Sequence, residues 1–238
     1  MKVVVSIGGS VLAPDLEPGR VRAFADAIEG LVADGHEVAA VVGGGRVARE
    51  YIGAARELGA NEIQLDDLGI AVTRLNARLL ITALGETAAP APAEDYETAG
   101  AALRRGDVAV MGGVVAAQTT DAVSAALAEY TDADLLVYAT NVSGVYDADP
   151  SEHPDATQYD DISADDLVSL VAGMEMNAGV NAPVDLLATK LIQRASLRTV
   201  VMDGTDPEAV AEAIRTGSHA GTDVIPKDAG ARPAEWDQ

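Results

Sequence analysis

The sequence contains no cysteine and few lysines, histidines or aromatic residues among its 238 positions. Without cysteine, the chain can form neither a disulfide framework nor a thiolate metal site. The three histidines (His36, His153 and His219) are far apart in the sequence and make no recognisable pair of metal ligands. We therefore expect no dedicated metal site.

Aromatic residues make up only 3% of the chain, whereas apolar residues as a whole make up 48%. This content is too high for a disordered chain, and the core must be built from Val, Leu, Ile and Ala. No apolar run reaches the roughly 18 residues that a membrane span needs. The N-terminus carries one charge before a short β-branched run, which is unlike a signal peptide. These features predict a cytoplasmic protein.

Basic residues are heavily outnumbered, because 16 Lys and Arg face 38 Asp and Glu, for a net charge of −22. Sequence-independent binding to nucleic acid needs a basic surface, so this balance argues against it. Only Lys2, Lys190 and Lys227 are lysines. An acidic surface poor in lysine predicts adaptation to high salt, in which ions screen the self-repulsion of the protein.

Short β-branched runs alternate with longer segments of helical period, which predicts an α/β fold with a largely parallel sheet. Strands are expected at 3–7, 37–42, 107–111, 135–140 and 199–202. Helices are expected at about 21–32, 47–58, 67–84, 121–130, 164–172, 186–196 and 207–216, with a short one ending near 105. The stretch 146–163 is rich in Asp and predicts a long functional loop.

Two of the expected helices have apolar positions at helical spacing. In the helix at 67–84 we expect Val72, Leu75, Leu79 and Leu80 to face inward. The helix after the second strand bears Val47, Tyr51, Ile52, Ala55 and Leu58. We expect one domain over residues 1–226 and a flexible tail over 227–238, although Trp236 could dock on a neighbour.

Glycine-rich turns follow three of the expected strands, at "SIGGS" (6–10), "GGGR" (43–46) and "VMGGVV" (110–115). The carboxyl ends of parallel strands share one edge of the sheet, where ligands bind. Glycine there lets backbone N–H groups approach an anion, and the next helix adds its dipole. One such turn is weak evidence, but three on one edge predict a site for two or more phosphate groups.

Two other kinds of nucleotide site also use glycine-rich turns and must be compared with this one. A P-loop is excluded, because no lysine stands in a G-x-x-x-x-G-K-[ST] context. A dinucleotide site remains a rival, since residues 43–48 satisfy G-x-G-x-x-A and Asp66 follows at a suitable distance. That site would use one turn only, and it normally follows the first strand.

A series of motifs resembles the amino-acid kinase family. They are "VVGGGRVAREY", "DDLGIAVTRLNARLL", "VMGG", "QTTDAVSAALAE", "LLVYATNVSGVYDADP" and "VDLLATKLI". The string N-V-x-G-V-Y-x-x-D-P (141–150) is typical of the superfamily, and Asp66-x-Leu68-Gly69 with Thr73-Arg74-x-Asn76-Ala77 resembles its archaeal uridylate kinase branch. The resemblance covers roughly residues 2–226. It implies a three-layer αβα sandwich with a mainly parallel central sheet.

The resemblance also implies an activity, which is phosphoryl transfer from ATP to UMP to give UDP and ADP. Mg²⁺ would travel with ATP, bridging its β- and γ-phosphates without a dedicated protein cage. The N-terminal part would mainly bind UMP, and the part from about residue 130 would mainly bind ATP. A homohexamer built as a trimer of dimers is expected on the same grounds.

The resemblance implies a set of binding residues. Those for the ATP phosphates are Gly9, Ser10, Gly45 and Arg49, and those for its nucleoside end are Thr140, Asn141, Tyr146 and Asp149. Those for UMP are Gly44, Asp66, Val114, Val115, Ala116, Ala117, Gln118, Thr119 and Thr120. Asp66 would repel a phosphate, so it suits the ribose hydroxyls, whereas hydroxyls at a helix start suit the phosphate.

Lys190 and Asp121 are the expected catalytic residues. The attacking phosphate oxygen is already ionised at neutral pH, so catalysis rests on positioning and charge neutralisation. Lys190 would neutralise charge on the phosphates, and Asp121 would orient the cationic groups. A solvated helix lysine and a simple charge at a helix N-terminus are the alternative interpretations.

Two positions depart from the family pattern. Ser6 stands where many members carry a lysine, so we expect Arg46 or Arg49 to supply part of the missing charge. Ala116 and Ala117 replace the Pro-Gly of the loop that binds UMP, so that loop is expected to differ in shape.

Other activities remain open at this point. Within the family, the acceptor could be acetylglutamate, aspartate, carbamate or isopentenyl phosphate. A carboxylate acceptor would favour basic residues where Asp66 stands, and an isopentenyl phosphate kinase would carry a histidine in the second glycine turn. A regulator without catalysis and a dinucleotide-binding oxidoreductase are the alternatives from other classes.

Overall fold

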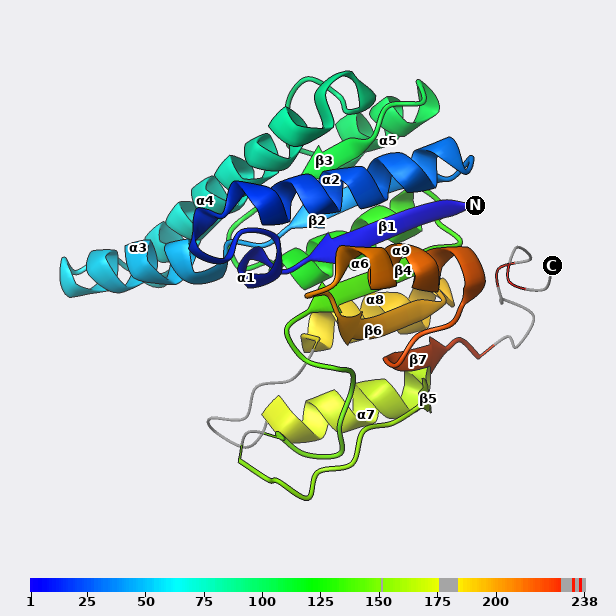
Figure 1. Cartoon of the computed structure of the whole chain (residues 1–238). Helices are drawn as coiled ribbons and strands as arrows, with labels where there is room; N and C mark the ends of the chain where they lie inside the picture. Colours follow the sequence, from blue (N-terminus) through cyan, green and yellow to red (C-terminus); the bar gives the residue numbers. More distant parts are fainter. Residues whose placement is uncertain (151, 176–183, 228–232, 234–235, 237–238) are drawn as a thin grey trace.

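Seven strands form one sheet in the order β3-β2-β1-β4-β6-β7-β5 (Figure 1). The computed structural model describes residues 1–150, 152–175, 184–227, 233 and 236. The strands are β1 (Lys2–Ile7), β2 (Glu37–Val42), β3 (Ala109–Met111), β4 (Leu135–Thr140), β5 (Asp161–Ser163), β6 (Thr199–Asp203) and β7 (Thr222–Ile225). Neighbouring strands in this sheet run parallel, except that β6 and β7 are antiparallel. The prediction of a mainly parallel sheet is confirmed.

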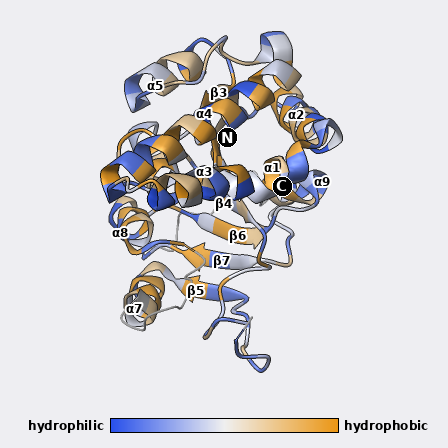
Figure 2. Ribbon diagram, turned by 90° about the vertical axis from the view of Figure 1, so that its left-hand side faces the viewer, coloured by the Kyte–Doolittle hydropathy of each residue, from blue (hydrophilic) through white to orange (hydrophobic). Residues whose placement is uncertain are grey.

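Helices cover both faces of the sheet, as Figure 2 shows from the carboxyl edge of the strands. They are α1 (Gly9–Leu12), α2 (Pro18–Ala33), α3 (Gly45–Glu57), α4 (Glu62–Leu84), α5 (Tyr96–Arg104), α6 (Thr120–Tyr130), α7 (Ala164–Glu175), α8 (Leu186–Ala195) and α9 (Pro207–Thr216). Helices α2, α9 and the second half of α4 share one apolar core, while α5, α6, α7 and α8 share the other. The fold is therefore the expected three-layer αβα sandwich.

The central strands are buried on both faces, because helices cover both sides. In β1, Val3 and Val5 pack into one core and Val4 into the other, as the alternation of side chains along a strand requires. The core is mostly aliphatic, and among the described residues only Phe24, Tyr138 and Trp236 are buried aromatic side chains.

Helix α4 begins five residues earlier than its apolar period indicated, at Glu62 and not at Asp67. The reason is a capping box that the sequence analysis missed. The Gln64 N–H donates to Asn61 Oδ1 at 3.1 Å, and the Asn61 N–H donates to Gln64 Oε1 at 3.0 Å. These two bonds satisfy donors that have no partner within the helix.

Two apolar residues expected to face inward are exposed. Leu75 and Leu79 on α4 expose 60% and 37% of their surface, so the prediction that they face inward is wrong. Tyr51 and Leu58 of α3 are also exposed, at 57% and 89%. Helix α3 projects beyond the sheet (Figure 1), and Ala48 is its one buried residue.

Two short strands at one end of the sheet were not predicted. Strand β5 occupies the end of the expected 146–163 loop, and β7 follows α9. Both have three or four residues and carry an aspartate, so their pattern does not distinguish them from a loop. They are strands because β5 pairs with β7, and β7 pairs with β6.

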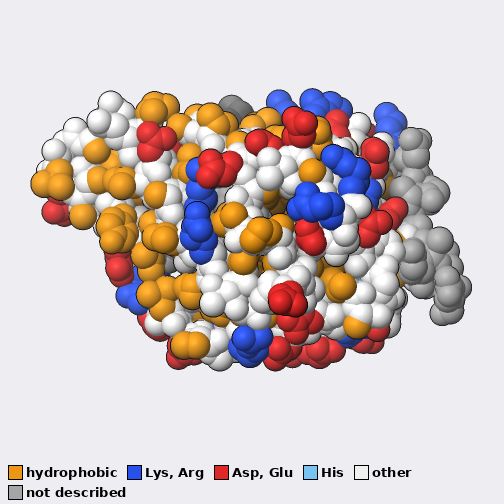
Figure 3. All heavy atoms as spheres, turned by 90° about the horizontal axis from the view of Figure 1, so that it is seen from above, with side chains coloured by type: hydrophobic (Ala, Val, Ile, Leu, Met, Phe, Trp, Pro, Cys, Tyr) orange, Lys and Arg blue, Asp and Glu red, His pale blue; other side chains and the backbone are white. Residues whose placement is uncertain are grey.

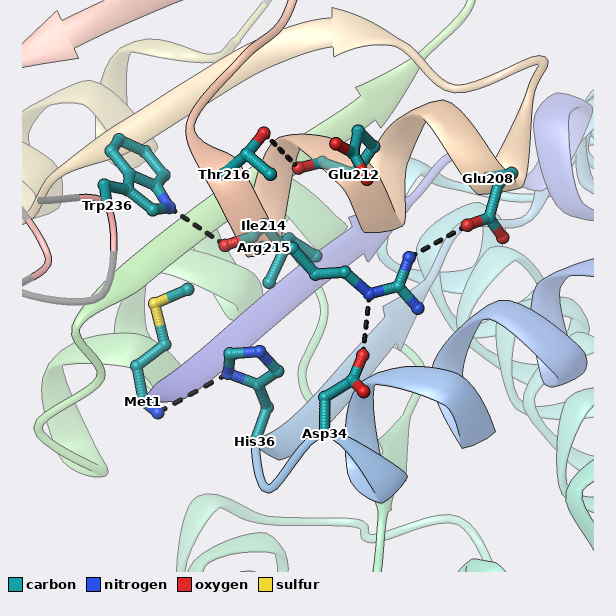
Figure 4. A network of polar contacts seen from close by, with 9 residues as sticks. All are labelled: Met1, Asp34, His36, Glu208, Glu212, Ile214, Arg215, Thr216 and Trp236. Carbon is teal, nitrogen blue, oxygen red and sulfur yellow. Dashed lines mark hydrogen bonds and ion pairs between the residues drawn. The ribbon is translucent and has the colours of Figure 1, made fainter. Parts of the chain in front are cut away.

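Trp236 packs against the end of α9 (Figure 4). Its Nε1 donates to the Ile214 carbonyl at 2.9 Å, and its ring is only 9% exposed. A Cβ on Gly217 would lie 2.6 Å from that ring, so glycine is needed there. The sequence suggested a flexible end, whereas the Trp236 side chain is packed against α9. Most of the 227–238 tail lies outside the described residues.

One described helix, spanning Glu62–Thr87, is long and apolar enough to cross a membrane by length and composition alone. The sequence analysis had found no such run. A core helix of a soluble protein passes the same test, and this one packs on α2 and α3. It also buries Thr73 and Asn76, two polar residues that contact the glycine turns described below.

Candidate active site

The order of the sheet reverses between β1 and β4, because β2 and β3 lie on one side of β1 and β6 on the other side of β4. In open α/β sheets, ligands bind in the crevice outside the carboxyl ends of the strands at such a point. The Gly8 N–H donates to the Ala139 carbonyl at 3.0 Å and joins the ends of these two strands. The candidate site lies at this edge, which faces the viewer in Figure 2.

The first two glycine turns touch each other through their backbones. A Cβ on Gly9 would lie 2.3 Å from the Gly45 nitrogen and 2.4 Å from the Gly43 carbonyl oxygen. Gly45 also has a φ of +63°, a conformation that side chains rarely adopt. Glycine is therefore required here by close packing, and the same packing places the backbone N–H groups of both turns next to each other.

Helix α4 holds the second and third glycine turns with two buried polar side chains. Asn76 Nδ2 donates to the carbonyls of Gly43 and Gly44 at 2.9 and 3.3 Å. Thr73 Oγ1 accepts from the Gly113 N–H at 2.7 Å. Both residues stood in a quoted motif, but the sequence analysis gave them no role. Their spacing of three on an otherwise apolar helix face was the signal that could have found them.

The predicted acceptor loop, residues 114–120, is hydrogen-bonded to Asp66. The Ala117 N–H donates to Asp66 Oδ2 at 2.8 Å, and Gln118 Nε2 donates to the Tyr96 hydroxyl at 3.1 Å. Ala117 has a φ of +66°, so the residue that replaces the family's glycine keeps a glycine-like backbone. The structure therefore brings Gly44, Asp66 and this loop together, since α4 contacts both turns.

The loop leads directly into the N-terminus of α6, an anion-binding feature. Thr119 caps this helix, and its Oγ1 accepts from the Ala122 N–H at 3.1 Å. The N–H groups of Thr120 and Asp121 precede the first bonds within the helix and point out of its end. A phosphate bound there would receive hydrogen bonds and the favourable end of the helix dipole.

Two carboxyl groups meet beside this helix end. The Thr119 hydroxyl donates to Asp185, which caps α8 by accepting from the Ala188 N–H at 2.9 Å. Burial and then the nearby charge of Asp185 raise the pKa of Asp121 from 3.8 to about 7. Tyr138 donates to the Asp121 carbonyl at 2.8 Å. Burial, followed by the charges of Asp121 and Asp185, raises the pKa of Tyr138 well above 10.

Asp185 is a site residue that the sequence analysis missed. It stands in the quoted "VDLLATK", immediately before the apolar period of α8, where an N-cap is expected. Lys190, the predicted catalytic lysine, lies five residues further along α8, about 7.5 Å by helix rise. It is exposed and makes no hydrogen bond or ion pair with any described residue. The structure therefore brings Asp185 next to Asp121, whereas Lys190 makes no ion pair with Asp121.

The two arginines proposed to compensate for Ser6 differ in position. Arg49 Nη2 donates to Ser10 Oγ at 3.3 Å, which places its charge at the first glycine turn. Arg46 instead pairs with Asp15 at 2.5 Å and Glu50 at 2.8 Å. Among the predicted ATP-phosphate residues, Gly9, Ser10, Gly45 and Arg49 are thus adjacent, and Arg46 has other partners.

The remaining predicted ATP residues lie in the segment that follows β4. Thr140 ends the strand, and its carbonyl accepts from the Gly204 N–H at 2.8 Å. Thr140 Oγ1 donates to Asn141 Oδ1 at 3.3 Å, and Tyr146 donates to Gln158 at 3.2 Å. The Asp149 carbonyl accepts from the His153 N–H at 2.8 Å. This segment runs beside α7 (Figure 1), on the β4 side of the switch point.

The sequence profile of the amino acid kinase family matches residues 1–203. The chain belongs to the amino acid kinase family. A uridylate kinase of Halobacterium salinarum is 66% identical over 236 residues, covering 99% of this chain and 98% of the relative. A uridylate kinase of Haloarcula marismortui is 63% identical over 227 residues, covering 95% of this chain and all of the relative.

The fold of this family member also matches those of solved structures. The crystal structure of uridylate kinase from Archaeoglobus fulgidus superposes with a TM-score of 0.85 at 46% identity. That match covers 94% of this chain and all of the other. A UMP kinase from Ureaplasma parvum, at 21% identity, shares the fold with a TM-score of 0.77.

Proposed function

We propose that this family member transfers the γ-phosphoryl group of ATP to UMP, giving UDP and ADP. The observation that carries the proposal is the contact between the donor and acceptor sides of the site, where Gly9 packs on Gly45 and α4 ties Gly44 to the acceptor loop. The similarity to uridylate kinases over nearly the whole chain supports the same acceptor.

The proposed mechanism depends on positioning. A UMP phosphate oxygen is ionised at neutral pH, so it attacks without a general base. The N-terminus of α6 would bind that phosphate, and Asp66 would accept from the ribose hydroxyls. Gly9, Ser10, Gly45 and Arg49 would bind the ATP phosphates from the opposite side. Mg²⁺ carried by ATP would neutralise charge on the β- and γ-phosphates when bound.

Asp121 and Asp185 would act from behind the α6 terminus. The charged form of Asp121 would repel a phosphate, so this carboxyl group is not expected to bind one directly. Through Thr119, Asp185 fixes the residue that caps α6, so both carboxyl groups control where the helix end presents its N–H groups. We assign Asp121 the role of orienting cationic groups and Asp185 the role of holding the cap.

The acceptor is tested by measuring ADP production from Mg-ATP in molar KCl with UMP, CMP, acetylglutamate, aspartate, carbamate and isopentenyl phosphate. Turnover with UMP alone is expected. Turnover with a carboxylate acceptor and not with UMP would contradict the proposal. NAD(H) binding that no uridine nucleotide competes with would favour an oxidoreductase instead.

Lys190 remains our candidate for neutralising the transferred phosphoryl group. Its exposed ammonium group is free to turn towards bound ATP, and lysine side chains are long and flexible. Lys190→Ala is expected to lower kcat on the order of 10²-fold with little change in the KM for UMP. Lys227→Ala, which removes an exposed lysine outside α8, is the control. Unchanged kcat in Lys190→Ala would remove this residue from the mechanism.

A homohexamer, a trimer of dimers, is proposed from the family resemblance, and an apolar surface that the described residues leave exposed supports an interface between chains. Seen from above (Figure 3), apolar side chains gather over α3 and the adjoining part of α4. They include Tyr51, Leu58, Ile63 and Leu75, each more than half exposed. Contiguous patches of this kind usually mark interfaces. A monomeric mass by light scattering in molar KCl would contradict the assembly.

A further inference from the structure

We infer that Arg74 is a positioning residue for the acceptor loop, residues 114–120, and that it acts on UMP binding without touching the substrate. The inference rests on the proposed function and adds a residue to it. Four observations carry it: a hollow between the loop and α4, the contacts of Arg74, the strained backbone of the loop and the separate support of the ATP side.

A hollow of about 610 Å³ is lined by α4 and by the first residues of the loop. Val114, Val115 and Ala116 form one wall, and Arg74 and Arg78 of α4 are among the residues of the other. A loop that borders such a space has room to move. Packing of apolar side chains does not prevent this, because Val115 is itself 57% exposed.

Arg74 spans from α4 to the base of the loop. Its Nε donates to the Gly113 carbonyl at 3.2 Å and its Nη2 to the Val114 carbonyl at 3.5 Å. Its Nη1 lies 3.4 Å from a carboxylate oxygen of Glu94. The side chain is 29% exposed, so these bonds form in a partly enclosed place. A planar guanidinium group can bind two carbonyls and a carboxylate together, which an ammonium group does less well.

The apex of the loop needs support. Ala117 holds a φ of +66°, which a residue with a Cβ keeps only where its surroundings enforce it. Asp66 provides one support by accepting from the Ala117 N–H. Asp66 is also the residue assigned to the ribose, so UMP would compete for its oxygens. Arg74 instead holds the base of the acceptor loop, and on this proposal the substrate does not contact it.

The ATP side has its own support. The turn at Gly43 and Gly44 is held by Asn76, and Gly9 packs on Gly45 without contact to Arg74. Loss of the Arg74 contacts is therefore expected to weaken UMP binding and to leave ATP binding unchanged.

Arg74→Ala tests the inference, with Arg78→Ala as the matched control. Arg78 lies one turn further along α4, lines the same hollow, is exposed and makes no side-chain hydrogen bond or ion pair with a described residue. Arg74→Ala is expected to raise the KM for UMP about tenfold, equivalent to about 1.4 kcal/mol, while the KM for ATP stays within about twofold. Arg74→Lys should recover part of the loss, because lysine can still donate to one carbonyl. Arg78→Ala should match the wild type for both substrates.

Three results would overturn the inference. They are an unchanged KM for UMP in Arg74→Ala, an equal rise for both substrates, and an equal effect in Arg78→Ala. If Arg74→Ala does not fold, the same selective rise must appear in Arg74→Lys, and its absence there overturns the inference too. Failure of the wild type to phosphorylate UMP would instead refute the proposed function, so the two failures are distinguishable.

Discussion

Asp121→Asn is expected to lose most of its activity and to become more stable at alkaline pH. The activity should fall on the order of 10²-fold, because a small misplacement of reacting groups has an effect of this size. The gain in stability follows from the raised pKa. Enclosure and the neighbouring Asp185 disfavour the charged form of Asp121, and asparagine removes that charge.

The pH dependence of this effect has a definite sign. The pKa of Asp121 is raised from 3.8 to about 7 in the folded protein, so folding favours the protonated carboxyl. The free energy of unfolding therefore falls as pH rises from about 4 to about 7. At pH 8 Asp121 is charged in the folded wild-type protein and lowers its free energy of unfolding by the full amount. The variant has no charge there and loses nothing. Since the carboxyl is partly accessible to solvent, we expect a gain of about 2 kcal/mol at pH 8 and almost none at pH 4.

Urea denaturation at pH 4.5 and pH 8, in constant molar KCl, measures this difference. Asp26→Asn, which removes one exposed charge from the middle of α2, is the control and should show no such pH dependence. A variant that loses activity and is also less stable at pH 8 would indicate that Asp121 is structural. Full activity would exclude it from the site.

Gly45→Ala is expected to have the second large effect, on stability and on ATP affinity together. A Cβ at this position would lie 2.5 Å from the Gly9 carbonyl carbon, and the φ of +63° disfavours any side chain. The strained φ alone costs about 1–2 kcal/mol, and the overlap with backbone atoms adds to it. We expect a loss of more than about 2 kcal/mol and a rise of roughly tenfold in the KM for ATP.

Gly53→Ala is the matched control, because Gly53 lies in the same helix and a Cβ there would have no atom within 4 Å. Alanine is favoured over glycine in a helix interior, so this variant should be about 0.5–1 kcal/mol more stable than the wild type. Chemical denaturation and ATP titration of both variants provide the comparison. If Gly45→Ala retained wild-type stability, the close packing of the two glycine turns would be wrong.

Much of the fold was predictable because its signals are local. Strands β1, β2 and β4 are continuous apolar runs, which a fully covered parallel strand requires. Helices α6 and α9 begin after Thr119 and Asp206, and each cap precedes an apolar period. The glycine turns were placed at the correct edge, because parallel strands have a common carboxyl end.

Other features depend on contacts between distant segments. The exposure of Leu58 and Leu75 follows from how far α3 and α4 extend past the sheet, which their periodicity does not encode. The short strands β5 and β7 exist because they pair with each other. In the site, Asp185 reaches Asp121 only because α8 packs against α6, a contact that the sequence analysis, which named Asp121 and Lys190, did not anticipate.

The amino-acid sequence by itself determined the α/β class, the aliphatic core and the three glycine turns, since each depends on residue type and on periods of a few residues. The tertiary structure decided which of these turns touch, which carboxyl groups meet and which side chain supports the acceptor loop. The physical reason is that hydrogen bonds, burial and pKa depend on atoms a few ångströms apart in space. For Asp66 and Ala117, or for Asp121 and Asp185, those atoms are 51 and 64 residues apart in the chain (117 − 66 and 185 − 121).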